Sequence, residues 1–177
     1  MREVGREEVN GNKRTLPPSS GRRQIIMKPL EENEYKYAVV YPLRPEHIAR
    51  ILGGKTTFCK YIGKPQRLRV REGTKLIFYS SGGFHEIVGE AEIDEVGFHS
   101  IEAALQKYRK SLFLTEEELV AYKGRFLRPS DEPLLVMSLR GIRRYRTPIR
   151  LEKPITMSGL TLTEEQYGDL LGPYGEA

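Results

Sequence analysis

The sequence has few of the residues from which disulfides, metal sites and membrane anchors are built. Its 177 residues include one cysteine, Cys59, which excludes a disulfide or a cysteine-based zinc site within one chain. The three histidines lack the spacing of metal ligands. No apolar run approaches the ~20 residues of a membrane-spanning helix, and the first five residues contain no apolar signal core. We therefore expect a cytoplasmic protein with no membrane attachment, no metal and no other cofactor.

Two common catalytic motifs are also missing. Gly54-Lys55-Thr56 matches the end of the phosphate-binding loop Gly-x-x-x-x-Gly-Lys-Ser/Thr, but the first glycine of that loop is absent. The nucleophile motif Gly-x-Ser-x-Gly does not occur. Cys59 lies within a predicted strand, where cysteine is more often a small apolar filler than a nucleophile. These observations favour a binding protein over an enzyme.

Positive charge is in excess, with 29 lysines and arginines against 24 acidic residues and a formal net charge of +5. Such a chain suits a polyanionic partner, because each cation set against a phosphate releases a bound counterion. The alternative is a basic surface that only keeps the protein soluble. Residues 1–33 are basic and rich in glycine, proline and serine, which predicts a flexible basic tail. Residues 34–177 are the predicted folded domain.

Hydrophobic periodicity and turn residues divide this domain into strands and helices. Strands are predicted at 35–41, 56–62, 75–80, 86–96 and 134–145, the last limited by Pro148. Helices are predicted at 45–52 and after the capping residues Ser100, Thr115 and Thr163. This order predicts an α+β fold, a small mixed β-barrel with helices packed outside it.

Within the 86–96 strand, apolar and acidic residues alternate. The alternation predicts a half-buried strand with an acidic outer face. The inward set is Ile87, Ala91 and Ile93, and the outward set is Glu90, Glu92 and Asp94.

The helix-to-strand turn at Gly53-Gly54 is the first candidate site. Cations for phosphates and rings for stacking are what single-stranded or flipped bases require. The alternative is a helix end followed by ordinary surface lysines. The candidate nucleic-acid-binding residues here are Arg44, Lys55, Thr56, Lys60 and Tyr61.

Two further stretches extend this candidate site. Tyr79, Ser80 and Ser81 lead into glycines that would let a ligand approach the backbone, although a plain glycine turn between strands is the more common case. Arginines at 140, 144 and 146 share one face of a strand and would follow a phosphate backbone, or else would pair with the acidic strand face. We expect the lysines and Arg140, Arg144 and Arg146 to converge on one electropositive groove beside aromatic rings. The loop 155–159 either packs on the domain or lines a pocket.

Four sequence segments resemble one known family. They are Tyr-Pro-Leu-Arg-Pro-Glu-His-Ile at 41–48, Gly-Gly-Lys-Thr-Thr-Phe-Cys-Lys-Tyr at 53–61, Gly-Thr-Lys-Leu-Ile-Phe-Tyr-Ser-Ser at 73–81 and Ile-Val-Gly-Glu-Ala-Glu-Ile at 87–93. Together they resemble the ASCH domain of the PUA-like superfamily, and most closely an archaeal family of unknown function, over about residues 35–171. The resemblance implies a small β-barrel with a cleft beside the helix-to-strand turn, and work on RNA.

The same resemblance raises an enzymatic alternative. Some ASCH relatives are amidohydrolases of an acetylated cytidine that use a lysine, a threonine three residues later and a distant glutamate. Lys55 matches that lysine, but Phe58 occupies the threonine position. The usual ASCH pattern has Glu and Arg where this chain has Phe58 and Lys60. If the chain were an enzyme, Lys55 and Thr57 would be its candidate catalytic residues.

Three functional hypotheses follow. The first is an RNA-binding protein for structured or modified RNA, with DNA as a further possible partner. The second is a nucleoside-directed amidohydrolase of the ASCH type. The third is a protein–protein adaptor whose acidic and basic strand faces meet different partners.

Overall fold

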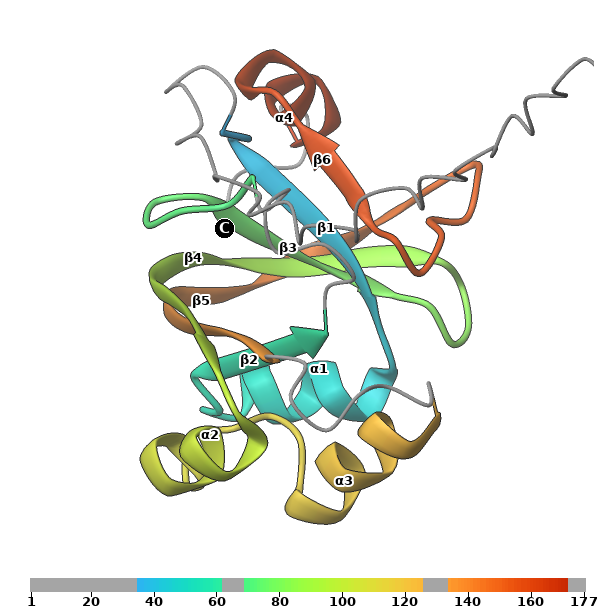
Figure 1. The fold of residues 1–177 in the computed structure, drawn as a ribbon. Coiled ribbons are helices and arrows are strands. Elements are labelled where there is room, and N and C mark those ends of the chain that lie inside the picture. The colour runs from blue at the N-terminus through green and yellow to red at the C-terminus, as the bar shows by residue number, and fades with distance from the viewer. Residues whose placement is uncertain (1–34, 62–68, 126–133, 172–177) are drawn as a thin grey trace, which may run out of the picture.

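The computed structural model describes residues 35–61, 69–125 and 134–171, which form one curled sheet with helices packed around it (Figure 1). The predicted tail, residues 1–33, lies outside the described residues. The strands are β1 (Ala38–Leu43), β2 (Thr57–Tyr61), β3 (Lys75–Ser80), β4 (Glu86–His99), β5 (Leu134–Arg150) and β6 (Leu160–Leu162). The helices are α1 (Pro45–Leu52), α2 (Ile101–Tyr108), α3 (Glu116–Arg125) and α4 (Glu164–Leu171).

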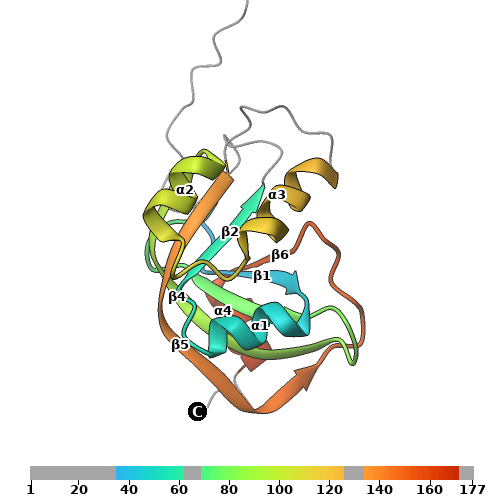
Figure 2. The ribbon, with the colours of Figure 1, turned by 90° about the horizontal axis from the view of Figure 1, so that it is seen from below.

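The sheet is mixed and its strand order is β2-β5-β4-β3-β1-β6. β1 pairs in parallel with β3, and the other neighbours are antiparallel. The sheet curls into a half-barrel, with α1, α2 and α3 at one end and α4 beside β6 at the other (Figures 1 and 2). The predicted α+β class and the helices outside the sheet are confirmed. In the part of the chain that the structure describes, no helix is long and apolar enough to cross a membrane.

The predicted helix starts are confirmed by their capping hydrogen bonds. The Ser100 hydroxyl accepts from the backbone N–H of Ala103 at 3.1 Å. Thr115 and Glu118 form a reciprocal capping box, with Thr115 N–H donating to the Glu118 carboxylate at 2.8 Å. Thr163 and Gln166 repeat that arrangement at the start of α4. Each box satisfies N–H groups that have no partner within the helix.

The number of strands and the length of β5 differ from the prediction. β6 was not anticipated; it has three residues, too few for a visible pattern, and pairs with β1. β5 continues to Arg150 instead of ending at residue 145. It passes Pro148 because the pairing register with β4 shifts there, from Arg144 opposite Gly89 to Ile149 opposite Ile87. Residues 145–148 bulge from the ladder, so the missing N–H of Pro148 costs no regular hydrogen bond.

The two faces of the sheet carry separate apolar clusters. In β1, Val39 belongs to the larger cluster, under α1 and α3, and Val40 belongs to the smaller one, under α4. In β4, Val88 is an extra residue between Ile87 and Gly89, since Tyr79 pairs with Ile87 while Phe78 pairs with Gly89. This bulge reverses the alternation.

The bulge makes two parts of the predicted β4 pattern wrong. Ile87 packs in the smaller cluster, whereas Ala91 and Ile93 pack in the larger one. Glu90 is not on an outer acidic face, because only 3% of it is exposed. Its carboxylate is buried beside the smaller apolar cluster, where it accepts hydrogen bonds from Tyr145 and Tyr167.

Candidate functional site

A cleft of about 360 Å³ opens where β1 ends, between β2, α1, α3 and the loop 151–159. This volume is at the lower end of the range for small-molecule sites, and it would suit a ligand of nucleoside size. The cleft is formed by five separate parts of the chain, so its shape depends on the whole fold. Its lining includes Tyr41, Pro42, Leu43, Arg44, His47, Phe58, Lys60, Ser81, Phe113, Glu118, Tyr122 and Met157.

Stacked aromatic rings form one wall of the cleft. The rings of Tyr41 and Phe58 are 5.7 Å apart and 5° from parallel, and those of Phe58 and Phe113 are 4.9 Å apart and 6° from parallel. His47 meets Phe113 edge-on at 5.3 Å. Gly159 lets the loop 151–159 lie on Tyr41, because a Cβ at this position would stand 2.6 Å from that ring. The wall is therefore apolar and fixed by close packing.

Lys60 places a cation in this apolar surrounding. Its Nζ atom lies 3.9 Å from the centre of the Tyr41 ring and donates a hydrogen bond to the Met157 carbonyl at 3.1 Å. Burial lowers the pKa of Lys60 to about 8. No carboxylate in the described ranges forms an ion pair with it. The amine is thus available to an acceptor or an anion that enters the cleft.

Glu118, the acidic residue of the cleft, is already occupied. Its carboxylate accepts from Arg50, from Thr115 N–H and, at 3.4 Å, from His47. Burial alone would raise the pKa of Glu118, but the bonds from Arg50, Thr115 and His47 lower it to about 2. Arg50 also donates to the carbonyl of Phe113 at 3.1 Å. These bonds neutralise Glu118, so that Lys60 in the cleft and Arg44 at its edge give the cleft a positive charge.

Only some of the residues predicted around the glycine turn lie at the cleft. Arg44, Lys60 and Ser81 line it. Lys55 points elsewhere and donates to the carbonyl of Lys110 at 2.6 Å. Thr56, next to Lys55, is exposed.

The remaining predictions on β2 and β3 fall on structural positions. Thr57 is 2% exposed and its hydroxyl bonds to that of Ser111 at 2.8 Å. Tyr61 is buried against Tyr122. Tyr79 is fully buried in the smaller cluster, and Ser80 is half-buried at the end of β3.

The arginines of β5 do not converge on the cleft, so the expectation of one shared groove is wrong. Arg140 stands opposite Glu92 in the ladder and donates to Glu92 and Asp94. Cross-strand partners share a face, so Arg140 points to the acidic residues of β4. Arg144 and Arg146 are exposed and form no ion pair with the residues that the structure describes.

Several cleft residues were missed by the sequence analysis. The sequence pattern marks Tyr41 only as a strand residue and gives no sign that Phe113 belongs to a site. Glu118 completes the capping box of Thr115, and its position next to the basic residues Arg50 and His47 depends on α1. Met157 belongs to the loop 155–159, whose pocket-lining alternative the structure supports. Among these missed residues, Met157 alone lies in a segment that the sequence marked as a candidate pocket lining.

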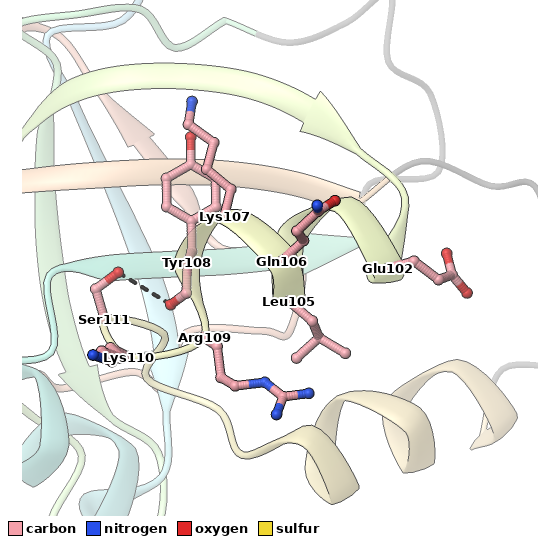
Figure 3. A pocket seen from close by; sticks show the side chains of 8 residues that line it. All are labelled: Glu102, Leu105, Gln106, Lys107, Tyr108, Arg109, Lys110 and Ser111. Carbon is pink, nitrogen blue, oxygen red and sulfur yellow. Dashed lines mark hydrogen bonds between the residues drawn. The ribbon is translucent and has the colours of Figure 1, made fainter.

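Two other hollows are less suited to a ligand. The larger, about 560 Å³, lies along α2 and the turn after it, and a single segment from Glu102 to Ser111 forms it (Figure 3). In this hollow Lys107 is already paired with Glu95. The second, about 490 Å³, surrounds Glu90, where acidic and basic side chains neutralise one another. Of these three hollows, the Lys60 cleft is the one in which several segments of the described chain place a cation without a carboxylate partner beside stacked aromatic rings.

Comparison with known proteins places this fold in a family. An uncharacterized protein, MJECS03 of Methanocaldococcus jannaschii, is 35% identical over 104 residues, which cover 55% of this chain and 96% of that protein. The ASCH protein of Zymomonas mobilis is 21% identical with a TM-score of 0.60, covering 77% of this chain and 94% of that one. The N-terminal domain of Staphylothermus marinus McrB has a TM-score of 0.51 at 13% identity, covering 78% and 94%.

These likenesses confirm the ASCH-type fold that the sequence motifs indicated. Residues 36–164 match the family described as "Domain of unknown function (DUF365)". The chain therefore belongs to the DUF365 family and has the fold of an ASCH domain.

Proposed function

We propose that this protein binds RNA and that the Lys60 cleft holds one of its nucleotides. The observation that carries the proposal is the Lys60 amine, held over the Tyr41 ring in an apolar cleft without a carboxylate partner among the described residues. A nucleotide offers the matching chemistry, since its base has an apolar face and its phosphate or carbonyl oxygens accept hydrogen bonds.

The rim of the cleft supports this proposal. Arg44 is exposed at the mouth, and its only ion pair in the described structure is a loose one with Glu46 at 3.7 Å. Met157 also lines the cleft, is 70% exposed and offers an apolar surface to a base. Lys60 has three N–H donors and uses one for Met157, which leaves two for a ligand. RNA is the polyanion that the sequence resemblance implies, and DNA is the alternative.

The other two hypotheses have less support. The amidohydrolase alternative relies on Lys55 and Thr57, and neither side chain reaches the cleft. The adaptor alternative relies on separate acidic and basic strand faces. In β4 and β5 these charges bind each other, as Arg140 does with Glu92.

Substitution of Lys60 and Lys55 provides a matched test, because each substitution removes one lysine from the same short segment. Fluorescence anisotropy would follow labelled tRNA, single-stranded RNA and single-stranded DNA at low salt. We expect Lys60→Gln to weaken RNA binding about tenfold, as for the loss of one charge-assisted hydrogen bond. Lys55→Gln should change it by less than about twofold, as for one distant screened charge.

Equal effects of the two substitutions would move the site away from the cleft. No binding of any nucleic acid at low salt would refute the proposal, because phosphate contacts are strongest there. Unchanged thermal unfolding of both variants would show that the fold is intact.

A further inference from the structure

The turn between β3 and β4 carries an aromatic ring at the surface. Phe84 is 70% exposed, and the guanidinium of Arg150 lies 5.5 Å from the centre of its ring. Arg150 stands on β5 opposite Glu86 and forms no ion pair with any described carboxylate. A flat ring backed by a free guanidinium is the arrangement on which nucleic-acid bases stack.

This turn is held rigidly rather than loosely. His85 has a φ of 57°, the left-handed region that a side chain other than glycine seldom adopts. Its Nδ1 atom lies 2.9 Å from the Tyr79 hydroxyl, which also accepts from the N–H of Ile155 at 3.3 Å. The His85 carbonyl accepts from the N–H of Leu151 at 3.2 Å. Such backbone strain persists only where surrounding contacts hold it, and here they fix the Phe84 turn against the loop 151–159.

The turn is continuous with the rim of the cleft. Ser81 lines the cleft, and Phe84 follows three residues later, a stretch of at most ~11 Å. Gly82 packs on Pro45, where an added Cβ would stand 3.3 Å from the ring, and Pro45 follows the cleft residue Arg44. In both ribbon views the β3–β4 turn and the loop before β6 lie on the same side of the molecule (Figures 1 and 2).

Positive charge continues from this turn along β5. Arg144, Arg146 and Arg150 are exposed, and none forms an ion pair within the described ranges. Arg140 and Arg143 of the same strand are bound to carboxylates. The unpaired charges are thus concentrated in the half of β5 that ends beside Phe84, which gives a polyanion a series of phosphate contacts that ends at this ring.

We propose that Phe84 and Arg150 form a second stacking site, which takes the base next to the one in the Lys60 cleft. This inference rests on the proposed function and narrows it. The ligand is a single-stranded segment of at least two nucleotides, with one base in the cleft, its neighbour on Phe84 and its phosphates toward the arginines of β5. A duplex, whose bases are stacked on each other, cannot occupy both sites.

A length series of ligands tests the second site. Titrations would use a nucleoside monophosphate, a trinucleotide, a pentanucleotide and a matched duplex, with wild type and Phe84→Ala. For wild type we expect tighter binding of the trinucleotide than of the monophosphate. Phe84→Ala should remove about tenfold of trinucleotide affinity, as for one base–aromatic stack, and leave the monophosphate unchanged.

Two further variants serve as controls. Phe84→Trp keeps a stacking surface and should restore the trinucleotide affinity. Phe98→Ala removes another exposed phenylalanine, 39% exposed at the far end of β4, and should have no effect on binding.

The remaining outcomes show whether the second site alone fails or whether the cleft fails with it. If Lys60→Gln weakens all ligands but Phe84→Ala binds the trinucleotide as wild type does, the second site is refuted and the cleft stands. If the duplex binds as tightly as the single strand, the second site is refuted as well. If neither the monophosphate nor any longer ligand binds to wild type, both proposals fail.

Discussion

The two faces of the sheet use charge in opposite ways. On the face under α4, Glu90 is buried and accepts from the Arg143 guanidinium at 2.7 and 2.9 Å, and from the hydroxyls of Tyr145 and Tyr167 at 2.7 Å each. On the other face, Lys60 lies in the cleft with a backbone carbonyl and an aromatic ring as neighbours. One face has its charges satisfied within the fold, and the other has a cation available to a ligand.

The strand register decides which arginines belong to which group. Arg143 stands opposite Glu90 and Arg140 opposite Glu92, and both are paired. Arg144 stands opposite Gly89, which has no side chain to meet it. A count of arginines in the sequence therefore overestimates the positive charge available to a ligand, because carboxylates on the neighbouring strand neutralise some of them.

The largest effect should follow from removing Glu90. Glu90→Ala leaves Arg143 and two tyrosine hydroxyls without their acceptor, which we expect to lower the free energy of unfolding by about 3 kcal/mol. Burial raises the pKa of Tyr145 and of Tyr167, and because the substitution leaves both rings in place, neither hydroxyl would ionise to compensate. Urea unfolding would measure the change.

RNA affinity measured well below the unfolding transition is the control for Glu90→Ala. It should stay within about twofold of wild type, because the cleft is on the other face of the sheet. A large loss of affinity in a folded Glu90→Ala protein would mean that the two faces are coupled, contrary to the comparison.

A smaller effect should follow from pH. Lys60 has a pKa of about 8, and an anionic ligand favours its charged form, so RNA affinity should fall as pH rises through 8. Between pH 7 and pH 9 we expect a loss of about fivefold, because most of the charge disappears over that range. Anisotropy at constant ionic strength would measure the loss. Lys60→Arg should bind with a flat profile, since a guanidinium stays charged.

The smallest effects should separate the arginines of β5. Arg144→Ala removes an unpaired charge and should weaken RNA binding about twofold to threefold, as expected of one exposed phosphate contact. Arg140→Ala removes a charge that Glu92 and Asp94 already neutralise, and should bind as tightly as wild type or slightly less. A salt titration would show a shallower slope for Arg144→Ala alone. Identical slopes would put Arg144 outside the path of the ligand.

Local signals allowed much of the fold to be predicted from the sequence. The caps at Ser100, Thr115 and Thr163 need only a side chain and a backbone N–H a few residues on, so they are readable without tertiary contacts. The helix from Pro45 was readable for the same reason, because the double glycine ends it. The motifs that resemble ASCH domains then supplied the arrangement of the sheet.

The parts that failed depend on distant residues. Glu90 is buried because Tyr167, 77 residues later, reaches its carboxylate, and no local pattern carries that information. The bulge at Val88 reversed the alternation of β4 and could be seen only from the pairing with β3. Lys55 and Lys60 were both predicted as cations of the glycine turn, and Lys55 also from its place in the family motif. The structure separates the two because only Lys60 faces the Tyr41 ring.

The pairing of β2 has a consequence for the order in which the protein matures during synthesis. In the described chain β2 forms its ladder with β5, from Thr57 opposite Ser138 to Tyr61 opposite Leu134, and it has a single further bridge from Thr57 to Leu112. Lys60 bonds to Met157, 97 residues further along. At ribosomal rates those 97 residues take roughly 5–20 s to add. The nascent chain therefore exposes the β2 segment without its β5 partner until residues 134–138 have been added, and the cleft is completed only after Met157 has followed.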